Sequence, residues 1–315
     1  MQSWMIFIIA VIVCRLAGLI FRRFSWGSWT ILLLSKLFFL FVLGVLGLFL
    51  DNFVLRQFGY AFALMFISTP ILVFAQSIYQ MIGDLIVSFK FKFKPPTMES
   101  HVQKGDYILP FTGKWTVFNG GVDEKLLHGG SASQKYAYDF IIVDDEGKSY
   151  AGDKRSAQSY HCYGKNILAI ADGVVVAVRK NAKDSFVDGL NAYCDSIDLR
   201  GNYIVIKHFD SEYSTTAHLM PGSVTVNVGD SVKQGEVIAK CGNSGNSSEP
   251  HIHFQLQTGK SFFLSAGLPI AFSDIEAQEK INYNLIDTRP HENNLQTAGG
   301  KFYIGRGLEV SNQCK

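Results

Sequence analysis

The chain has 315 residues, of which 48% are hydrophobic and 18% charged, and its formal net charge is +2. This length exceeds that of one small domain, and so nearly neutral a chain argues against a nucleic-acid partner. The averages conceal a division, because residues 1 to about 90 are dominated by Leu, Phe, Ile and Val, whereas the remainder has an ordinary globular composition. A signal peptide does not explain the beginning, since apolar segments recur after the first one and no small-residue cleavage site intervenes.

The region 1–90 is predicted to be a membrane anchor that crosses the lipid bilayer more than once. Its apolar segments predict spans at about residues 5–21, 30–50 and 59–82. The second is the clearest of them, because about 20 residues of helix cover the hydrocarbon core of a bilayer. The third belongs to an apolar stretch that Pro70 and Asp84 interrupt, and it is either a kinked span with an interfacial piece or a re-entrant hairpin.

Two topologies remain open. Positive charges gather around the first connection and again after the third segment, at Arg15, Arg22, Arg23, Lys36, Lys90, Lys92 and Lys94. Cytoplasmic loops carry an excess of Lys and Arg, so three full spans would return the rest of the chain to the cytoplasm. A re-entrant third segment, or an external first connection, would leave it on the extracytoplasmic side.

The remainder of the chain is predicted to be an antiparallel all-β domain. After a linker at 91–104, short alternating runs punctuated by Gly, Asn and Asp read as strands and tight turns. These runs lie at 167–180, 201–209, 212–220, 223–242 and 251–257. Helical periodicity is nearly absent between residues 100 and 270. We expect a domain at 105–262, followed by a C-terminal extension at 263–315 to which the sequence assigns no role.

Two histidines flank a single isoleucine in the stretch SSEPHIHFQLQ, residues 247–257. Alternation along a strand puts one set of side chains on a polar face, namely His251, His253 and Gln255, and the other set on an apolar face, namely Ile252, Phe254 and Leu256. The apolar face suits a core, while the polar face presents two imidazoles to a common ion or substrate. Taken alone, the motif is equally compatible with two solvated surface histidines.

A carboxylate inside an apolar run indicates a metal site. Asp139 lies within AYDFIIV, and a buried carboxylate is costly unless a cation or a hydrogen-bond donor compensates it. A zinc ion held by His128, Asp139 and one imidazole of His251 or His253 would do so. Three protein ligands and a water are typical of a catalytic zinc site. No His-Glu-x-x-His sequence is present, which excludes the thermolysin arrangement.

The stretch TTAHLMPGSVTVNVGDSVKQGEVIAKCGNSGNSSEPHIHFQLQ resembles the core of the lysostaphin-like zinc metallopeptidases, which are cell-wall endopeptidases. LPFTGKWTVFNGG, HGGSASQKYAYDF and ILAIADGVVVAV precede it in the order that the family shows. The resemblance covers roughly residues 105 to 260, and it includes neither the membrane segments nor residues 265 to 315. It implies antiparallel β-sheets of the duplicated hybrid motif type, and with the apolar segments the expected fold is N-terminal transmembrane helices followed by this all-β domain.

The resemblance also implies the site and its activity. Zn²⁺ would be held by His128, Asp139 and His253, although the spacing between the first two is longer than the compact His-x-x-x-Asp form of the family. His251 and His218 match catalytic positions, where they would orient or deprotonate a zinc-bound water and stabilise the oxyanion. The implied activity is that of a membrane-anchored zinc metalloendopeptidase, acting on peptidoglycan stem peptides or cross-bridges outside the cytoplasmic membrane.

Two other functions fit parts of the pattern. VNVGDSVKQGEVIAKCG also resembles a biotinyl or lipoyl carrier, but Lys183 and Lys207 lack the setting of a modified lysine. A non-catalytic protein of the same fold, which binds cell wall or regulates another hydrolase, is the stronger rival. Such proteins usually lose metal ligands or catalytic histidines, whereas every matching position is filled here.

The remaining histidines and cysteines receive structural interpretations. His208 follows a strand, His161 stands beside a lone cysteine, and His101 and His291 fall in the linker and the tail. Cys162 and Cys194 bracket a polar excursion between strands, and in an oxidising compartment they would either pair or remain two separate thiols.

Overall fold

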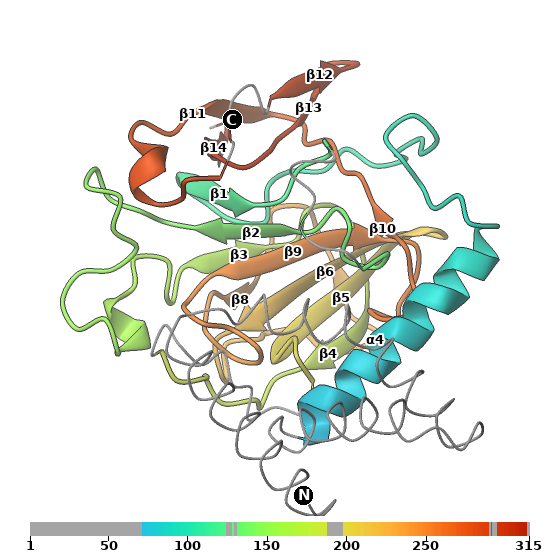
Figure 1. Cartoon of the computed structure of the whole chain (residues 1–315), viewed down its shortest axis with the longest axis horizontal. Helices are drawn as coiled ribbons and strands as arrows, with labels where there is room; N and C mark the ends of the chain where they lie inside the picture. Colours follow the sequence, from blue (N-terminus) through green and yellow to red (C-terminus); the bar gives the residue numbers. More distant parts are fainter. Residues whose placement is uncertain are drawn as a thin grey trace, which may run out of the picture. The chain divides into compact units, whose positions relative to one another are not determined.

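The computed structural model describes residues 71–123, 128, 131–187, 198–289, 291 and 295–313 (Figure 1). The predicted spans at 5–21 and 30–50, and the first part of the third, lie outside these residues. The chain divides into two compact units, Met1–Ile78 with Gly189–Ala192, and Tyr79–Asp188 with Tyr193–Lys315. In the first unit the described residues belong to a helix, and the second unit carries the sheets. None of the helices in the described ranges combines the length and hydropathy that a bilayer crossing demands.

The second unit is built on a large antiparallel sheet, as the sequence predicts. Its strand order is β11-β14-β1-β2-β9-β6-β5-β4-β7, with β10 paired to β9. The bounds are β1 (Trp115–Asn119), β2 (Tyr138–Ile141), β4 (Gly173–Arg179), β5 (Asn202–Phe209), β6 (Glu212–Leu219), β7 (Ser231–Val232), β9 (Ile252–Gln257), β10 (Gly267–Leu268), β11 (Ile275–Glu279) and β14 (Leu308–Asn312). Two further pairs stand apart, β3 (Asn166–Leu168) with β8 (Val237–Lys240), and β12 (Gln296–Ala298) with β13 (Lys301–Tyr303).

The core lies on one face of the large sheet. Alternate residues of β9 (Ile252, Phe254 and Leu256) enter it, together with Val117, Phe140 and Ile206 from neighbouring strands. The β3–β8 pair contributes Ile167, Ile238 and Ala239 to the same cluster. These side chains are almost wholly buried, so their removal from water supplies much of the driving force that holds the layers together.

The C-terminal extension joins the large sheet. β14 pairs with β1, through Trp115 opposite Val310, and β11 pairs with β14 on its far side. Along the chain, a short 3₁₀ helix, η2 (Tyr283–Leu285), lies between β11 and β14. A second 3₁₀ helix, η1 (Ala157–Ser159), precedes β3. β1 is the neighbour of β2, the strand that carries Asp139. Because β14 pairs with the other side of β1, β1 is not an open edge of the sheet.

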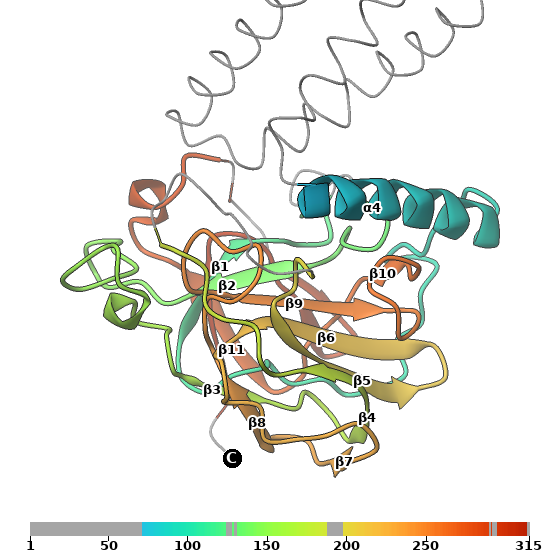
Figure 2. The ribbon, with the colours of Figure 1, turned by 90° about the horizontal axis from the view of Figure 1, so that it is seen from below.

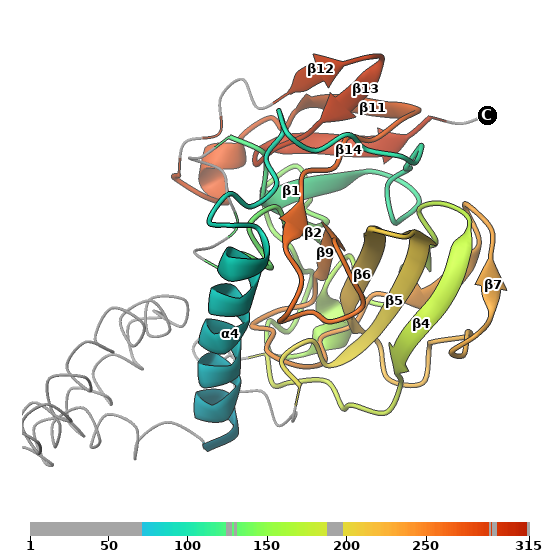
Figure 3. The ribbon, with the colours of Figure 1, turned by 90° about the vertical axis from the view of Figure 1, so that its right-hand side faces the viewer.

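One α-helix, α4 (Ile71–Lys90), precedes the sheet. It overlaps the end of the third predicted membrane segment. Its Tyr79–Lys90 part belongs to the same compact unit as the strands. Figures 2 and 3 show this Tyr79–Lys90 part beside the strands. The Tyr79 ring packs against Phe263, with ring centroids 4.9 Å apart.

Candidate metal centre

Two adjacent strands place the central pair of the site. Asp139 of β2 lies directly opposite His253 of β9 in the antiparallel register, and His253 Nδ1 is 3.0 Å from Asp139 Oδ1. Opposed residues of antiparallel strands have Cβ atoms about 4.5–5.5 Å apart, so both side chains reach one point above the sheet. On the other face of β9, Ile252 and Phe254 enter the core as alternation predicts.

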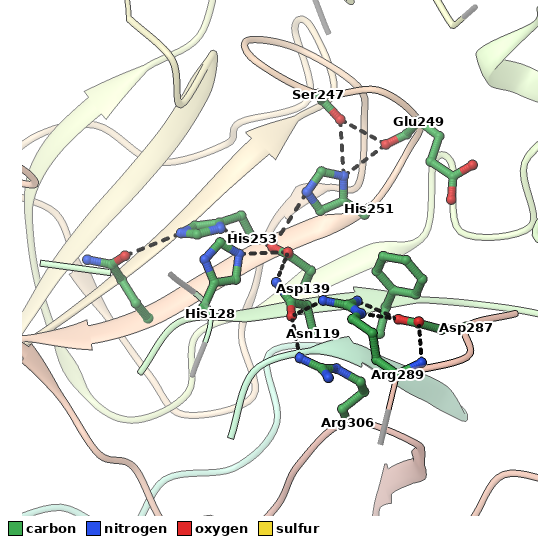
Figure 4. A network of polar contacts seen from close by, with 12 residues as sticks. Asn119, His128, Asp139, Ser247, Glu249, His251, His253, Asp287, Arg289 and Arg306 are labelled. Carbon is green, nitrogen blue, oxygen red and sulfur yellow. Dashed lines mark hydrogen bonds and ion pairs between the residues drawn. The ribbon is translucent and has the colours of Figure 1, made fainter. Parts of the chain in front are cut away.

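The third member comes from the loop before β2. His128 Nε2 lies 2.7 Å from Asp139 Oδ2, and the His128 and His253 rings stand edge to face with centroids 4.9 Å apart. One ligand atom from each of His128, Asp139 and His253 lies within 4.8 Å of the others. Figure 4 shows the three side chains pointing toward one another. The structure therefore brings together the three residues that the sequence predicts as zinc ligands.

The environment of Asp139 favours its ionised form. Burial alone would raise the pKa of this carboxyl, but the His128 imidazole beside it and hydrogen bonds with His128 and His253 hold the pKa well below its usual range. Asn119 Nδ2 also donates to Asp139 Oδ2, at 3.4 Å. The carboxylate is therefore available as a metal ligand at neutral pH.

Two arginines from the C-terminal extension fix the Asn119 amide. Arg289 Nη1 and Arg306 Nη2 donate to Asn119 Oδ1, at 3.2 and 3.1 Å (Figure 4). Because this oxygen accepts both bonds, the amide nitrogen is the atom that faces Asp139. The extension thus contributes to the site through Asn119.

A glutamine fixes the tautomer of His253. Gln255 Nε2 donates to the Ser133 carbonyl and to Gln257 Oε1, so Gln255 Oε1 is the atom left to accept from His253 Nε2–H, at 3.2 Å. In the neutral ring the proton therefore sits on Nε2 and the Nδ1 lone pair faces Asp139, whereas the protonated ring also donates from Nδ1 to the carboxylate. Metal-binding histidines commonly donate their second nitrogen to such an acceptor, which orients the ring.

Two further imidazoles stand beside the three ligands. His251 Nδ1 donates to the Glu249 carbonyl at 2.8 Å, and its Nε2 lies 3.6 Å from Asp139 Oδ1. His218 Nδ1 donates to the Ser244 carbonyl at 2.8 Å, and its ring centroid is 4.7 Å from that of His251. In both rings the carbonyl selects the Nδ1–H tautomer and leaves an unprotonated Nε2.

His218 reaches this position through an uncommon backbone conformation. Its neighbour Ala217 is paired with His253, and strict alternation would direct the next side chain away from the site. His218 has φ of 60°, in the left-handed region. Burial, and then the neighbouring His251 and His253, hold the pKa of His218 well below its usual range, so it is neutral at pH 7.

The other histidines serve local structure. His208 bonds the Asp172 carbonyl through Nδ1 and Ser214 Oγ through Nε2. His161 Nε2 lies 3.7 Å from Asp144, and His101 Nε2 lies 3.4 Å from the buried Glu212. Asn119, Arg289 and Arg306 support the site, but no local sequence pattern marks them. Alternation along the strand predicts that Gln255 shares the face of His253 and does not predict its role.

Of the two alternatives for Cys162 and Cys194, a disulfide or separate thiols, the structure shows Cys162 as a free thiol, while Cys194 lies outside the described residues. Cys162 is a buried free thiol whose Sγ donates to the Pro250 carbonyl at 3.0 Å. Cys241 is a second buried free thiol. Through Pro250, Cys162 supports the loop that leads into His251.

Comparison with known proteins assigns part of this chain. Residues 156–263 match the profile of peptidase family M23. This range contains His218, His251 and His253 but begins after His128 and Asp139. His128 and Asp139 lie outside the matched range, and their contacts with each other and with His253 place them in the same site.

Two curated relatives are similar to part of this chain. An uncharacterised metalloprotease of Buchnera aphidicola is 36% identical over 93 residues, 30% of this chain and 20% of the relative. The peptidoglycan DD-endopeptidase ShyB of Vibrio cholerae is 30% identical over 122 residues, 38% of this chain and 24% of the relative. The chain thus spans about a quarter or less of the length of these relatives.

Solved structures give lower similarity. The antimicrobial peptidase lysostaphin of Staphylococcus simulans is 21% identical, with a TM-score of 0.31 over 50% of each chain. The catalytic domain of the prophage-encoded M23 protein EnpA of Enterococcus faecalis is 18% identical, with a TM-score of 0.34 over 52% of this chain and 94% of its own.

Proposed function

Because this chain carries a domain of peptidase family M23, we propose that it is a membrane-anchored zinc metalloendopeptidase that hydrolyses peptide bonds in peptidoglycan stem peptides or cross-bridges. One observation carries the proposal. His128, Asp139 and His253 converge on one point, and two further imidazoles with unprotonated Nε2 atoms stand beside it.

The donor set fits zinc. Two imidazole nitrogens and one carboxylate oxygen are ligands that Zn²⁺ accepts at about 2.0–2.2 Å, and three protein ligands leave a position open for water. His253 presents Nδ1 because Gln255 occupies its Nε2–H. Asp139 is held ionised by its neighbours. When bound, zinc would polarise a scissile carbonyl and lower the pKa of a coordinated water toward 7.

The two remaining imidazoles supply proton chemistry. His251 is oriented by the Glu249 carbonyl and by Ser247 Oγ, 3.1 Å away. Its Nε2 accepts a proton as the nucleophile attacks, and returns it to the leaving amine. His218 is neutral and anchored on Ser244 through Nδ1–H, so its unprotonated Nε2 accepts a hydrogen bond from the nucleophilic water and positions it.

The substrate and the location are parts of the same proposal. A relative that is 30% identical over 122 residues is a peptidoglycan DD-endopeptidase, which supports peptide bonds of peptidoglycan as the substrate. The apolar segments at 5–21, 30–50 and 59–82 support attachment to the lipid bilayer. Peptidoglycan lies outside the cytoplasmic membrane, so the domain would have to lie on that side.

Digestion of defined muropeptides by the purified full chain tests the proposal. We expect cleavage of a peptide bond, identified by product mass, with stoichiometric zinc that a chelator removes together with the activity. His253→Ala or Asp139→Ala should lose zinc and activity, because each removes one of three ligands. His251→Ala should keep zinc and lose turnover by roughly 10²-fold or more.

The matched control is His161→Ala, which removes a histidine from outside the metal centre. It should leave both zinc content and turnover unchanged. A wild-type chain that binds zinc but cleaves no muropeptide would favour the non-catalytic, wall-binding alternative.

A further inference from the structure

The Tyr79–Lys90 part of α4 turns its polar side toward the domain. Asp84 Oδ1 accepts hydrogen bonds from the Ala132 backbone N–H at 2.9 Å and from Ser131 Oγ at 3.1 Å. Gln80 Nε2 donates to Ser131 Oγ and Ser133 Oγ, at 2.6 and 3.1 Å. The helix is thus attached by a polar network, whereas helices that pack on a soluble domain usually bury an apolar stripe.

A glycine allows this close packing. A Cβ atom at Gly83 would lie 2.0 Å from the Phe263 carbonyl oxygen, so no other residue fits there without moving the helix. Gly83 and Val87, one turn apart, are both buried. They mark the centre of the face that contacts the domain.

The opposite side of the helix is apolar and exposed. With 3.6 residues per turn, Leu85 and Phe89 lie on the side away from Gly83 and Val87. Four large apolar side chains on this side are between 44% and 68% exposed, namely Ile82, Leu85, Ile86 and Phe89. This contiguous apolar stripe, facing away from the domain, requires a partner.

The residues after α4 have a distinctive composition. The sequence Lys-Phe-Lys-Phe-Lys covers residues 90–94, and all three lysines and Phe93 are exposed. Aromatic rings and lysine side chains are enriched where protein meets the boundary between lipid headgroups and acyl chains. Clustered lysines also attract anionic lipid headgroups.

We propose that the outward face of α4, with Phe93 and the three lysines, binds the surface of a bilayer that contains anionic lipids. A second copy of this chain would use the apolar stripe but would leave the lysines of both copies close together without acidic partners. Because Gln80 and Asp84 make one side of α4 polar, the helix is amphipathic and would lie along the interface. The segment that leads into it is apolar at 59–69, which keeps the helix near the membrane.

This inference extends the proposed membrane attachment and is independent of peptidase activity. Its consequence is geometric. The face of α4 opposite the lipid holds Ser131, Ala132 and Ser133, which follow His128 in the chain, and Ser133 also accepts from Gln255. Lipid on one side of the helix and the metal centre on the other would be separated by one helix and one loop.

Depth-dependent fluorescence quenching in the full chain tests the proposal. We substitute Leu85→Trp or Phe89→Trp and reconstitute the protein in vesicles of phosphatidylcholine and phosphatidylglycerol with brominated acyl chains. An interfacial helix buries its apolar face about 5–10 Å into the headgroup boundary, so the added emission should fall roughly twofold relative to unbrominated vesicles. The unsubstituted chain gives the background of the native tryptophans.

The matched control is Val102→Trp, at a position that is 83% exposed and lies beyond the helix. Its emission should respond to aqueous acrylamide and not to bromine. Replacing Lys90, Lys92 and Lys94 together by Gln should reduce the bromine quenching at position 85 in vesicles rich in phosphatidylglycerol.

Three outcomes would overturn the proposal. Quenching by acrylamide alone places the helix face in water. If neither bromine nor acrylamide quenches the added tryptophan and the protein is a dimer, the apolar stripe is covered by a second copy. If neither quenches it and the protein is a monomer, the stripe is covered by another segment of this chain. Sedimentation of the chain with vesicles and digestion of muropeptides report attachment and activity separately, so either can hold when the role of α4 fails.

Discussion

His218 occupies a backbone conformation that residues with a Cβ atom seldom adopt, and the site depends on it. A left-handed φ at a non-glycine residue costs about 1–2 kcal/mol, and such strain persists where the surroundings impose it. Here the backbone N–H of His218 bonds the Arg200 carbonyl, and its ring bonds Ser244. Hydrogen bonds of the main chain and of the side chain thus hold His218 in this strained conformation.

We expect His218→Gly to be more stable than His218→Ala by about 1 kcal/mol in the free energy of unfolding, because glycine adopts positive φ without penalty. Both variants should lose most of the turnover, since both lack the imidazole. Chemical denaturation of the two variants measures the difference. An alanine variant equal to or more stable than the glycine variant would contradict strain at this position.

Some of the site's residues could be predicted from sequence, and others could not. Period-two alternation placed His253 and Gln255 on one face, and an apolar run singled out Asp139. The direction of the His218 side chain depends on one dihedral angle that no local pattern encodes. Asn119, Arg289 and Arg306 meet only through the pairing of β1 with β14, and such long-range pairing leaves no periodic signal in the sequence.

At the scale of elements, α4 links the apolar N-terminal region to the loop that carries the first metal ligand. Hydropathy predicted a membrane piece in this region, but it could not show that Gln80 and Asp84 contact the domain. The spacing between His128 and Asp139, longer than the compact motif, acquires an explanation. The additional residues form the loop that Asp84 holds through Ser131 and Ala132.

Asp84→Ala should loosen this loop, because it leaves the Ala132 N–H without its carboxylate acceptor. We expect zinc affinity to fall by roughly 10-fold or more, the scale at which groups that support metal ligands act. The free energy of unfolding should fall by only about 1–3 kcal/mol. Competition with a fluorescent chelator measures the affinity.

Leu85→Ala is the matched control, because Leu85 is the next residue along the helix and faces outward. It should leave zinc affinity unchanged. Equal affinities in the Asp84 and Leu85 variants would show that the contact of α4 is unrelated to the metal centre.

At the scale of the whole molecule, the proposed substrate and the positive charges make opposite demands on topology. The charges favour a cytoplasmic domain if the third apolar segment is a full span. The described part of that segment belongs to α4, whose outward face is proposed above to lie along the bilayer surface. An interfacial α4 would leave the domain on the side at which the second span ends.

We therefore expect protease added to intact spheroplasts to degrade the domain at residues 105–262. Immunoblotting with an antibody against the domain gives the readout, and a cytoplasmic enzyme that survives the treatment is the control for intact cells. Protection in intact spheroplasts, with digestion only after lysis, would place the domain inside and weaken the assignment of peptidoglycan as substrate.

The pairing of β1 with β14 also has a consequence for the time at which the protein becomes active. Asn312 donates to the Leu109 carbonyl across 203 residues of chain, and β14 completes the sheet beside the strand that carries Asn119. During synthesis, the three proposed metal ligands and the two further imidazoles are therefore made well before β14. These residues are His128, Asp139, His253, His218 and His251. Contacts between residues so distant in sequence form late in folding, because the chain must lose the entropy of closing a long loop before these contacts can stabilise it. The site of a nascent chain would thus remain incomplete until β14 has been made, so any activity that depends on Asn119 and its arginine partners would begin only when the whole sheet has assembled.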